Sequence, residues 1–273
     1  MIPVFVPSYK RYRATFLVRS MNYRFPLYLF VRDEDVEGYR WIKGRPNTHL
    51  IRLKQVTNIG ETRAAMVRYA QRHNIDRIFM LDDDITRLDL TLWDATKEIA
   101  RASGTMKKAA ENWDLVLSAW ENLWEDEALL GASYRPYSWS LAEREIQGKT
   151  RAQLQQCIGV NIELLVQTGI NYRSSAEVGN EDLFLQLECY QHGLKALKTN
   201  QIQYDCPAMG SGVGGCNSDN VSIVEKQKQR VELFMQACKN DPRVVVRTTK
   251  SGVPSIKFNW KYIEEVNNEP LHE

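Results

Sequence analysis

Short apolar runs alternate with polar or amphipathic stretches through the first 85 residues, and this alternation restricts the fold strongly. Each run ends at turn-forming or charged residues, as buried strands do. Strands separated by a helical stretch pair in parallel, because a parallel connection needs a dozen or more residues. We therefore predict an α/β fold with a mostly parallel central sheet flanked by helices. The expected strands are Ile2–Val6, Leu27–Val31, Leu50–Leu53 and Arg77–Leu81, with a helix over Glu61–Arg72.

The rest of the chain has a stronger helical pattern. From about Trp93 to Leu130 we expect an added helical segment, with Trp113, Trp120 and Trp124 packed on one face. No internal repeat or clear linker is present, so we expect a single domain over residues 1–273. The other expected elements are a strand at Cys157–Val160, a helix ending near Gly169, a helix over Asn180–His192, a glycine-rich loop over Met209–Cys216, a helix over Val221–Cys238, and one or two strands after Pro242.

Composition allows one sizeable core, because 43% of the 273 residues are hydrophobic. No apolar run reaches the roughly 18 residues of a membrane-spanning helix, so no membrane partner is expected. The apolar start at Met1–Val6 lacks a basic region and is too short for a signal peptide. Five cysteines form no CxxC pair and leave an odd one over, which favours reduced thiols in the cytoplasm.

Charge is unevenly distributed although the net charge is only +2. Residues 1–72 are rich in Lys and Arg, whereas residues 82–150 carry an excess of Asp and Glu. Part of this pattern is explained by solvated helix faces. A basic first quarter also suits phosphate-bearing ligands, whether a nucleotide, a nucleic acid or both.

Three adjacent acids, Asp82, Asp83 and Asp84, directly follow the strand expected at Arg77–Leu81. In open α/β sheets, ligands bind at the carboxyl ends of the strands. Adjacent carboxylates repel one another unless they share a cation, and Mg²⁺ or Mn²⁺ prefers oxygen ligands from protein and phosphate. The alternative is a solvated acidic turn. We favour a metal site that bridges the protein to a diphosphate.

A second acidic pair, Glu181 and Asp182, lies in the first turn of the helix expected after Asn180. Acids also favour this position because of the helix dipole. An inverting sugar transfer needs a carboxylate that takes the proton from the acceptor hydroxyl as it attacks. We choose Asp182 for this role, and we expect Glu181 to contact the acceptor or orient Asp182.

Four motifs resemble those of GT-A glycosyltransferases in order and rough spacing, over the span from Ile2 to about Lys198. The similarity is closest to the TET-associated glycosyltransferases of phages and bacteria. It implies transfer of a sugar from a UDP-sugar to hydroxymethylpyrimidines in DNA, with Mn²⁺ or Mg²⁺. The nucleotide-sugar half would span about residues 1–90 and the acceptor half about 91–273. The motifs are Val6-Pro-Ser-Tyr9, Asn58-Ile-Gly-Glu-Thr-Arg63, Leu81-Asp-Asp-Asp84 and Gly179-Asn-Glu-Asp182.

The resemblance also implies roles for single residues. The loop after the first strand would hold the donor base, with Tyr9 available to stack on uracil, and either Asp33 or Asp35 would read the base edge. Asp82 would face the ribose or base, Asp84 would bind the metal with Asp82 as the second ligand, and Asp182 would be the catalytic base. Arg11 and Arg13 are expected at phosphate by charge and position. The residues expected at the nucleotide are Pro7, Ser8, Tyr9, Arg11, Arg13, Asp33, Asp35, Arg63, Asp82 and Asp83.

One departure from the family pattern concerns the metal. Many members supply a further ligand, often His, from a late loop, but no His lies between Tyr204 and Asn220. The oxygen ligands available there are Asp205, Asn217 and Asp219.

Three alternatives stay open. The acceptor could be a saccharide, a lipid-linked sugar or a protein in place of DNA. A nucleotidyltransferase would also use a strand-end acid and a metal, but it would want a glycine-rich phosphate loop after the first strand, and none is present. A silent DNA- or partner-binding module on this fold is disfavoured by the retention of Asp84 and Asp182. The aromatic residues that could hold a flipped base are Trp41, Tyr134, Tyr137 and Trp139.

Overall fold

The computed structural model describes residues 1–12, 24–93, 99–104, 109–134, 148–207, 222–249 and 252–268. Several residues named above lie outside these ranges: Arg13, Tyr137, Trp139, Asn217, Asp219 and the glycine-rich loop at Met209–Cys216.

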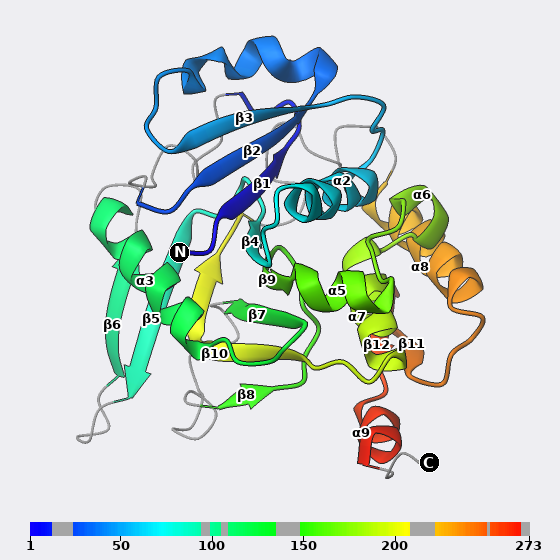
Figure 1. Ribbon diagram of the computed structural model, residues 1–273. Helices are drawn as coiled ribbons and strands as arrows, with labels where there is room; N and C mark the ends of the chain where they lie inside the picture. The colour runs from blue at the N-terminus through cyan, green and yellow to red at the C-terminus, as the bar shows by residue number, and fades with distance from the viewer. Residues whose placement is uncertain are drawn as a thin grey trace.

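The first half of the chain forms the parallel part of the central sheet, as predicted (Figure 1). Its strand order is β3-β2-β1-β4, and all three neighbouring pairs are parallel. The connections carry a 3-10 helix, η1 (Asp33–Ile42), and the helix α2 (Ile59–Arg72). The strands are β1 (Val4–Ser8), β2 (Leu27–Arg32), β3 (Thr48–Leu53) and β4 (Arg77–Leu81).

The remaining strands continue the same sheet with mixed strand directions. Next to β4 lies the antiparallel β9 (Cys157–Asn161), followed by β7 (Leu129–Tyr134) and β10 (Ala196–Asp205), which are parallel to each other. The edge is an antiparallel pair, β5 (Arg87–Trp93) and β6 (Ile99–Gly104), and the short β8 (Lys149–Thr150) also pairs with β10. After Pro242, β11 (Val244–Thr248) and β12 (Pro254–Phe258) form a small separate sheet, as expected.

The prediction of a continuous helical segment from Trp93 to Leu130 is wrong. Among the described residues of this stretch, α3 (Ala109–Leu123) is helical, whereas Trp93 ends β5, Ile99–Gly104 form β6, and Leu129 and Leu130 begin β7. The sequence around Leu88 and Leu90 has the period-2 alternation of a strand, and its partners in β10 lie more than 100 residues further along the chain. The packing role of the tryptophans is confirmed, because Trp113, Trp120 and Trp124 are all buried.

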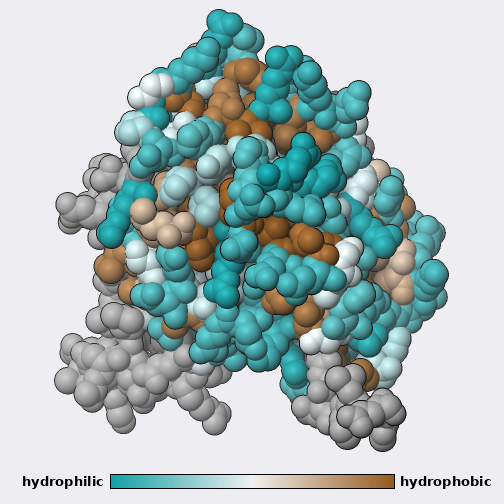
Figure 2. All heavy atoms as spheres, viewed as in Figure 1, coloured by the Kyte–Doolittle hydropathy of each residue, from teal (hydrophilic) through white to brown (hydrophobic). Residues whose placement is uncertain are grey.

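Two apolar cores lie on the two faces of the sheet. One contains side chains from α2, α5 (Ile162–Thr168), α7 (Glu181–Gln191) and α8 (Ile223–Ala237). The other contains side chains from η1 and α3. The helices α6 (Ser175–Val178) and α9 (Trp260–Asn268) complete the described elements. Among the described residues, no helix is both long and apolar enough to cross a membrane. Figure 2 shows apolar patches between mainly hydrophilic side chains on one face.

Asparagine side chains fix the starts of the two helices that carry site residues. Asn58 caps α2 by accepting from the backbone N–H of Glu61 at 3.1 Å, and Asn180 caps α7 by accepting from Leu183 at 3.3 Å. Both caps place the first helical turn at the carboxyl end of the parallel strands. The sequence of each helix start therefore determines where Arg63, Glu181 and Asp182 lie.

Candidate active site

The candidate site lies at the carboxyl ends of β1 and β4. The chain winds from β1 outward to β2 and β3, and then returns to place β4 on the other side of β1. This reversal opens a crevice at the strand ends, where ligands bind in open α/β sheets. Ser8 ends β1, and the three acids Asp82, Asp83 and Asp84 follow β4.

Asp83 is buried and links β4 to the segment after β1. Its Oδ2 accepts a hydrogen bond from the Ser8 hydroxyl at 2.5 Å, and its Oδ1 accepts from Arg11 Nη1 at 2.5 Å. Because Ser8 donates to Asp83, the Tyr39 hydroxyl donates to Ser8 Oγ at 2.5 Å. Burial raises the pKa of Asp83 to about 7 against the opposing effect of Arg11. Asp83 thus faces protein groups, and sequence reasoning gave no signal for Tyr39.

Asp84 lies at the surface of the same acidic turn. Its Oδ2 is 2.9 Å from Arg11 Nη1, whereas its Oδ1 is buried without a hydrogen-bond partner. Burial and the charge of Asp82 raise the pKa of Asp84. A buried carboxylate oxygen without a donor is a suitable ligand for a cation.

The guanidinium group of Arg63 contacts the remaining acids of the site. Arg63 is buried, its Nη2 donates to Asp82 at 2.8 Å, and its Nη1 donates to Glu181 at 2.8 Å and to Asp182. Burial opposes the charge of Arg63, but the carboxylates of Asp182, Asp82 and Glu181 outweigh it and raise the pKa of Arg63. The structure therefore brings together the acids after β4 and those at the start of α7. The Arg63 side chain is buried, so it does not lie at an open surface that a nucleotide could contact.

Asp182 has the electrostatic surroundings of a proton acceptor near neutral pH. Burial raises its pKa to about 7, and Glu181 and Asp82 act in the same direction, whereas Arg63 lowers it. Glu181 has a second contact besides Arg63, because its Oε2 accepts a hydrogen bond from the Ser175 hydroxyl at 2.9 Å. Tyr172 packs near Arg63 with its hydroxyl buried and without a hydrogen-bond partner, and nothing in the sequence pointed to it.

The residues expected around the donor base lie at the ends of β1 and β2. Pro7 and Ser8 belong to β1, so Tyr9 is the first residue beyond the strand. The Tyr9 ring is already in contact with cations: the guanidinium carbon of Arg32 is 3.9 Å and Lys10 Nζ is 4.9 Å from its centroid. A base stacked on Tyr9 must share the ring with these groups or displace them.

The two candidate acids after β2 have different surroundings. Asp33 is partly exposed and forms an ion pair with Arg52. Asp35 is buried, one of its oxygens accepts from the Tyr12 hydroxyl at 2.5 Å, and the other has no hydrogen-bond partner. Both acids have an oxygen without a hydrogen-bond partner, Asp33 Oδ1 and Asp35 Oδ2, but Asp33 Oδ1 is the atom that lies against Arg52.

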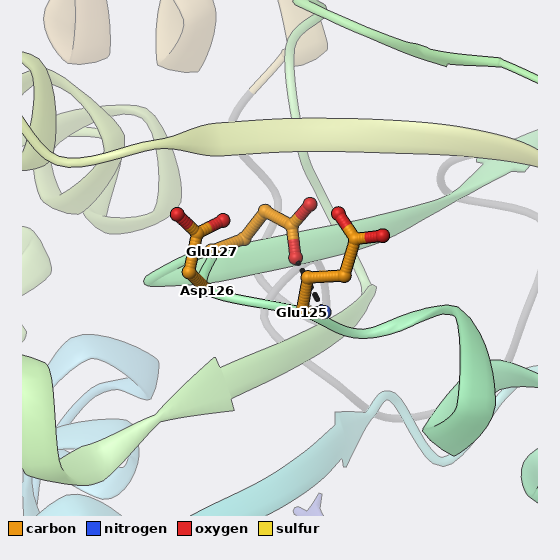
Figure 3. Close-up of side chains that lie close together, drawn as sticks. All are labelled: Glu125, Asp126 and Glu127. Atoms are coloured by element: carbon orange, nitrogen blue, oxygen red, sulfur yellow. Dashed lines mark hydrogen bonds between the residues drawn. The ribbon is translucent and has the colours of Figure 1, made fainter.

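A second acidic group, at Glu125, Asp126 and Glu127, is close enough together to hold a metal (Figure 3). Lysines already neutralise it: Lys149 Nζ lies 2.6 Å from Glu127 and 3.1 Å from Glu125, and Lys195 Nζ lies 2.6 Å from Asp126. The group precedes β7, which runs in the same direction as β4, so it lies at the opposite edge of the sheet from Asp82–Asp84. We do not assign a metal to it.

The acids at the candidate site fit a divalent cation better. Within the described part of the chain, two arginines, Arg11 and Arg63, form the ion pairs with these five acids, which leaves an excess of negative charge when all of the acids are ionised. The acids are Asp82, Asp83, Asp84, Glu181 and Asp182. Asp84 and Asp82 are the residues that would hold Mn²⁺ or Mg²⁺. The late loop expected to add a ligand is described only as far as residue 207, and its first residues include Asp205 at the end of β10.

The parallel part of the sheet, with acids at the end of β4 and at the start of α7, is the arrangement expected of a GT-A type fold. The family model of the TET-Associated Glycosyltransferase matches residues 2–214. The chain belongs to this family, and it is therefore a glycosyltransferase, which confirms the resemblance carried by the four motifs.

Solved structures with a similar chain path are distant in sequence. One is described as a nucleotide-diphospho-sugar transferase from Desulfovibrio desulfuricans, with 12% identity, a TM-score of 0.43, and coverage of 87% of this chain and 99% of that one. A 4-diphosphocytidyl-2C-methyl-D-erythritol synthase from Anaerococcus prevotii has 7% identity, a TM-score of 0.42, and coverage of 85% and 96%. A cytidylyltransferase from Leptospira borgpetersenii has 12% identity, a TM-score of 0.41, and coverage of 88% and 94%. Such low values say nothing about the reaction. No curated protein matches the sequence.

Proposed function

We propose that this glycosyltransferase moves a sugar from a UDP-sugar to the hydroxyl of a 5-hydroxymethylpyrimidine in DNA, with inversion at the anomeric carbon. The convergence of Asp82, Glu181 and Asp182 on Arg63, beside Asp84, is the observation that carries the proposal. The proposed base, Asp182, and the proposed metal ligand, Asp84, thus belong to one group of acids, which supports the proposal. Family membership and the basic first quarter of the chain support DNA as the acceptor.

The proposed reaction uses Asp182 as the base. As the acceptor oxygen forms its bond to the anomeric carbon, the bond from that carbon to the diphosphate oxygen breaks. The acceptor proton passes to a carboxylate oxygen of Asp182, and UDP leaves with the bonding electron pair. Attack from the side opposite the leaving group inverts the anomeric configuration. A Mn²⁺ or Mg²⁺ ion held by Asp84 and Asp82 would offset the negative charge on the diphosphate.

The donor nucleotide is proposed to lie between the ends of β1 and β2. Asp35 supplies the acceptor oxygen for the base edge, in preference to Asp33, whose carboxylate pairs with Arg52. The Tyr9 ring offers a stacking surface at the end of β1. Arg11, which now pairs with Asp83 and Asp84, is close enough to the acidic turn to contact the diphosphate.

The proposal is tested by nucleoside diphosphate release from a panel of UDP-sugars with Mn²⁺. Reactions contain DNA with 5-hydroxymethylcytosine, unmodified DNA or no acceptor. We expect release that requires the modified DNA and that falls at least a hundredfold in Asp84→Asn and Asp182→Asn. Glu125→Gln is the matched control, because it removes one acid from the lysine-paired group at the other edge of the sheet. Equal release by wild type and Asp182→Asn would contradict the proposed base.

A further inference from the structure

Arg63 connects two parts of the candidate site that are far apart in sequence. It reaches Asp82, which follows β4, and also Glu181 and Asp182, which begin α7. Its side chain is only 4% exposed, and the ring of Tyr172 lies 5.9 Å from its guanidinium carbon. A group so enclosed by carboxylates and an aromatic ring lies within the wall of the crevice.

We propose that Arg63 is a positioning residue for the general base: its guanidinium favours the ionised form of Asp182 and fixes that carboxylate relative to Asp82. This inference rests on the proposed function, since it takes Asp182 as the proton acceptor. It differs from the role that the family resemblance implied for Arg63, which was direct contact with the nucleotide.

Electrostatics explains why the site needs this cation. Burial disfavours the charged form of a carboxylate, and two further acids beside Asp182 add repulsion. An arginine within ion-pair distance opposes both effects. Its planar fork holds carboxylates in fixed directions on two sides, whereas the donors of a lysine ammonium rotate and fix no such directions. The chemistry therefore calls for an arginine at this position.

The surrounding backbone holds Arg63 in place. Near the start of α2, Gly60 approaches residue 173 so closely that an added Cβ would lie 2.1 Å from the Arg173 carbonyl oxygen. Ser175, two residues on, receives the Gly60 N–H on its hydroxyl at 3.1 Å and donates to Glu181 at 2.9 Å. These contacts join α2, α6 and α7 around the Arg63 guanidinium. The position of the guanidinium is therefore fixed relative to Asp182.

Two substitutions separate the charge of Arg63 from its geometry. Arg63→Lys keeps a positive charge but loses the fork, and Arg63→Met removes the charge while keeping a long side chain. Arg68, an exposed residue of the same helix, gives the matched controls Arg68→Lys and Arg68→Met. The readouts are the titration of the Asp182 carboxyl by ¹³C NMR, the affinity for UDP with Mn²⁺, and the pH profile of kcat/KM.

We expect the Asp182 titration to move upward by about one pH unit or more in Arg63→Met and by less in Arg63→Lys, while the Arg68 variants match wild type. The acidic limb of the kcat/KM profile should move by the same amount. Affinity for UDP should stay within about threefold of wild type. An Asp182 titration that does not move in either Arg63 variant overturns the proposal, and a tenfold loss of UDP affinity alongside it assigns Arg63 to the nucleotide.

Arg63→Met leaves three carboxylates without their shared cation and can fail to fold. In that case, Arg63→Met is combined with Glu181→Gln, which removes one negative charge together with the positive one, and the Asp182 titration is compared with that of Glu181→Gln alone, because Glu181 itself raises the pKa of Asp182. Sugar transfer by the wild-type protein tests the proposed function, whereas the Asp182 titration tests Arg63. The two proposals therefore fail on different measurements.

Discussion

Arg11 Nη1 lies 2.9 Å from Asp84 Oδ2, so an arginine already contacts the acid that we propose as a metal ligand. The same nitrogen donates to Asp83 at 2.5 Å. The guanidinium thus supplies positive charge at the acidic turn, and a divalent cation bound by Asp84 has to compete with it. Binding of metal and donor would free Arg11 to contact the diphosphate, where its charge is again matched.

This competition predicts that Arg11→Gln binds Mn²⁺ more tightly than wild type when no nucleotide is present. Loss of one ion pair of moderate exposure corresponds to about 1 kcal/mol, or roughly fivefold in affinity. In the presence of UDP the order should reverse, because the variant lacks a phosphate contact. Electron paramagnetic resonance of free Mn²⁺ measures both affinities. Arg52→Gln, which removes the partner of Asp33, is the control. Weaker Mn²⁺ binding by Arg11→Gln without nucleotide would rule out competition.

The pH dependence of sugar transfer should report Asp182. Its pKa is about 7 in the folded protein, and only the ionised form can accept a proton. We expect kcat/KM to fall about tenfold per pH unit below pH 7 and to level off above it. Asp182→Asn should lower kcat/KM by roughly 10²–10⁴-fold at every pH, because the base is absent. A profile that is flat from pH 5 to 8 in the wild type would assign the base to another group.

Asp83 predicts a stability effect of defined sign. Burial raises its folded-state pKa from 3.8 to about 7, so in this window the folded protein binds a proton that the unfolded chain has lost. This contribution to stability is present at low pH and is lost as pH rises to about 7. Asn does not titrate, so Asp83→Asn does not lose stability in this way. The unfolding free energy of Asp83→Asn relative to wild type should therefore rise by on the order of 2 kcal/mol as pH increases from 5 to 8.

Urea unfolding across this pH range measures the difference. Asp126→Asn is the control, because Asp126 is exposed and its pKa is lowered by Lys195, so its contribution is lost only in more acidic solution. A stability difference between wild type and Asp83→Asn that stays constant from pH 5 to 8 would contradict the assigned pKa.

The cap of α7 should matter more for activity than its stability effect alone implies. Asn180→Ala removes the acceptor for the Leu183 N–H and should cost about 1 kcal/mol of unfolding free energy. Ser222→Ala removes the equivalent cap of α8 and should cost a similar amount. Because α7 begins with Glu181 and Asp182, only Asn180→Ala should also lower kcat/KM, by about tenfold. Equal activity of the two variants would show that the cap does not position Asp182.

Local sequence signals predicted the first half of the fold well. The apolar run at Arg77–Leu81 matches β4, and the helix predicted at Glu61–Arg72 begins two residues earlier in the structure because Asn58 is its cap. The mixed part of the sheet was harder to predict, because β5 and β7 both pair with β10, which is far away in the sequence. β10 also changes register against β7 between Thr199 and Gln203, which no local pattern predicts.

Part of the candidate site was also predictable from local sequence signals. Acids after a buried strand and at a helix start are visible in the sequence, and both sets meet at one end of the sheet. The burial of Arg63 among them was not visible, since its partners lie 19, 118 and 119 residues away. Nor did the sequence distinguish Asp35 from Asp33, because the distinction depends on Tyr12 and Arg52 as neighbours.

The most direct test of the proposed function is the mass of the product. DNA that contains 5-hydroxymethylcytosine is incubated with the protein, Mn²⁺ and a UDP-sugar that supports diphosphate release, and its nucleosides are then analysed by mass spectrometry. We predict a nucleoside heavier by one sugar residue with wild type and Glu125→Gln, and none with Asp84→Asn or Asp182→Asn. Diphosphate release without any glycosylated nucleoside would contradict DNA as the acceptor, and an unchanged yield from Asp182→Asn would contradict the site.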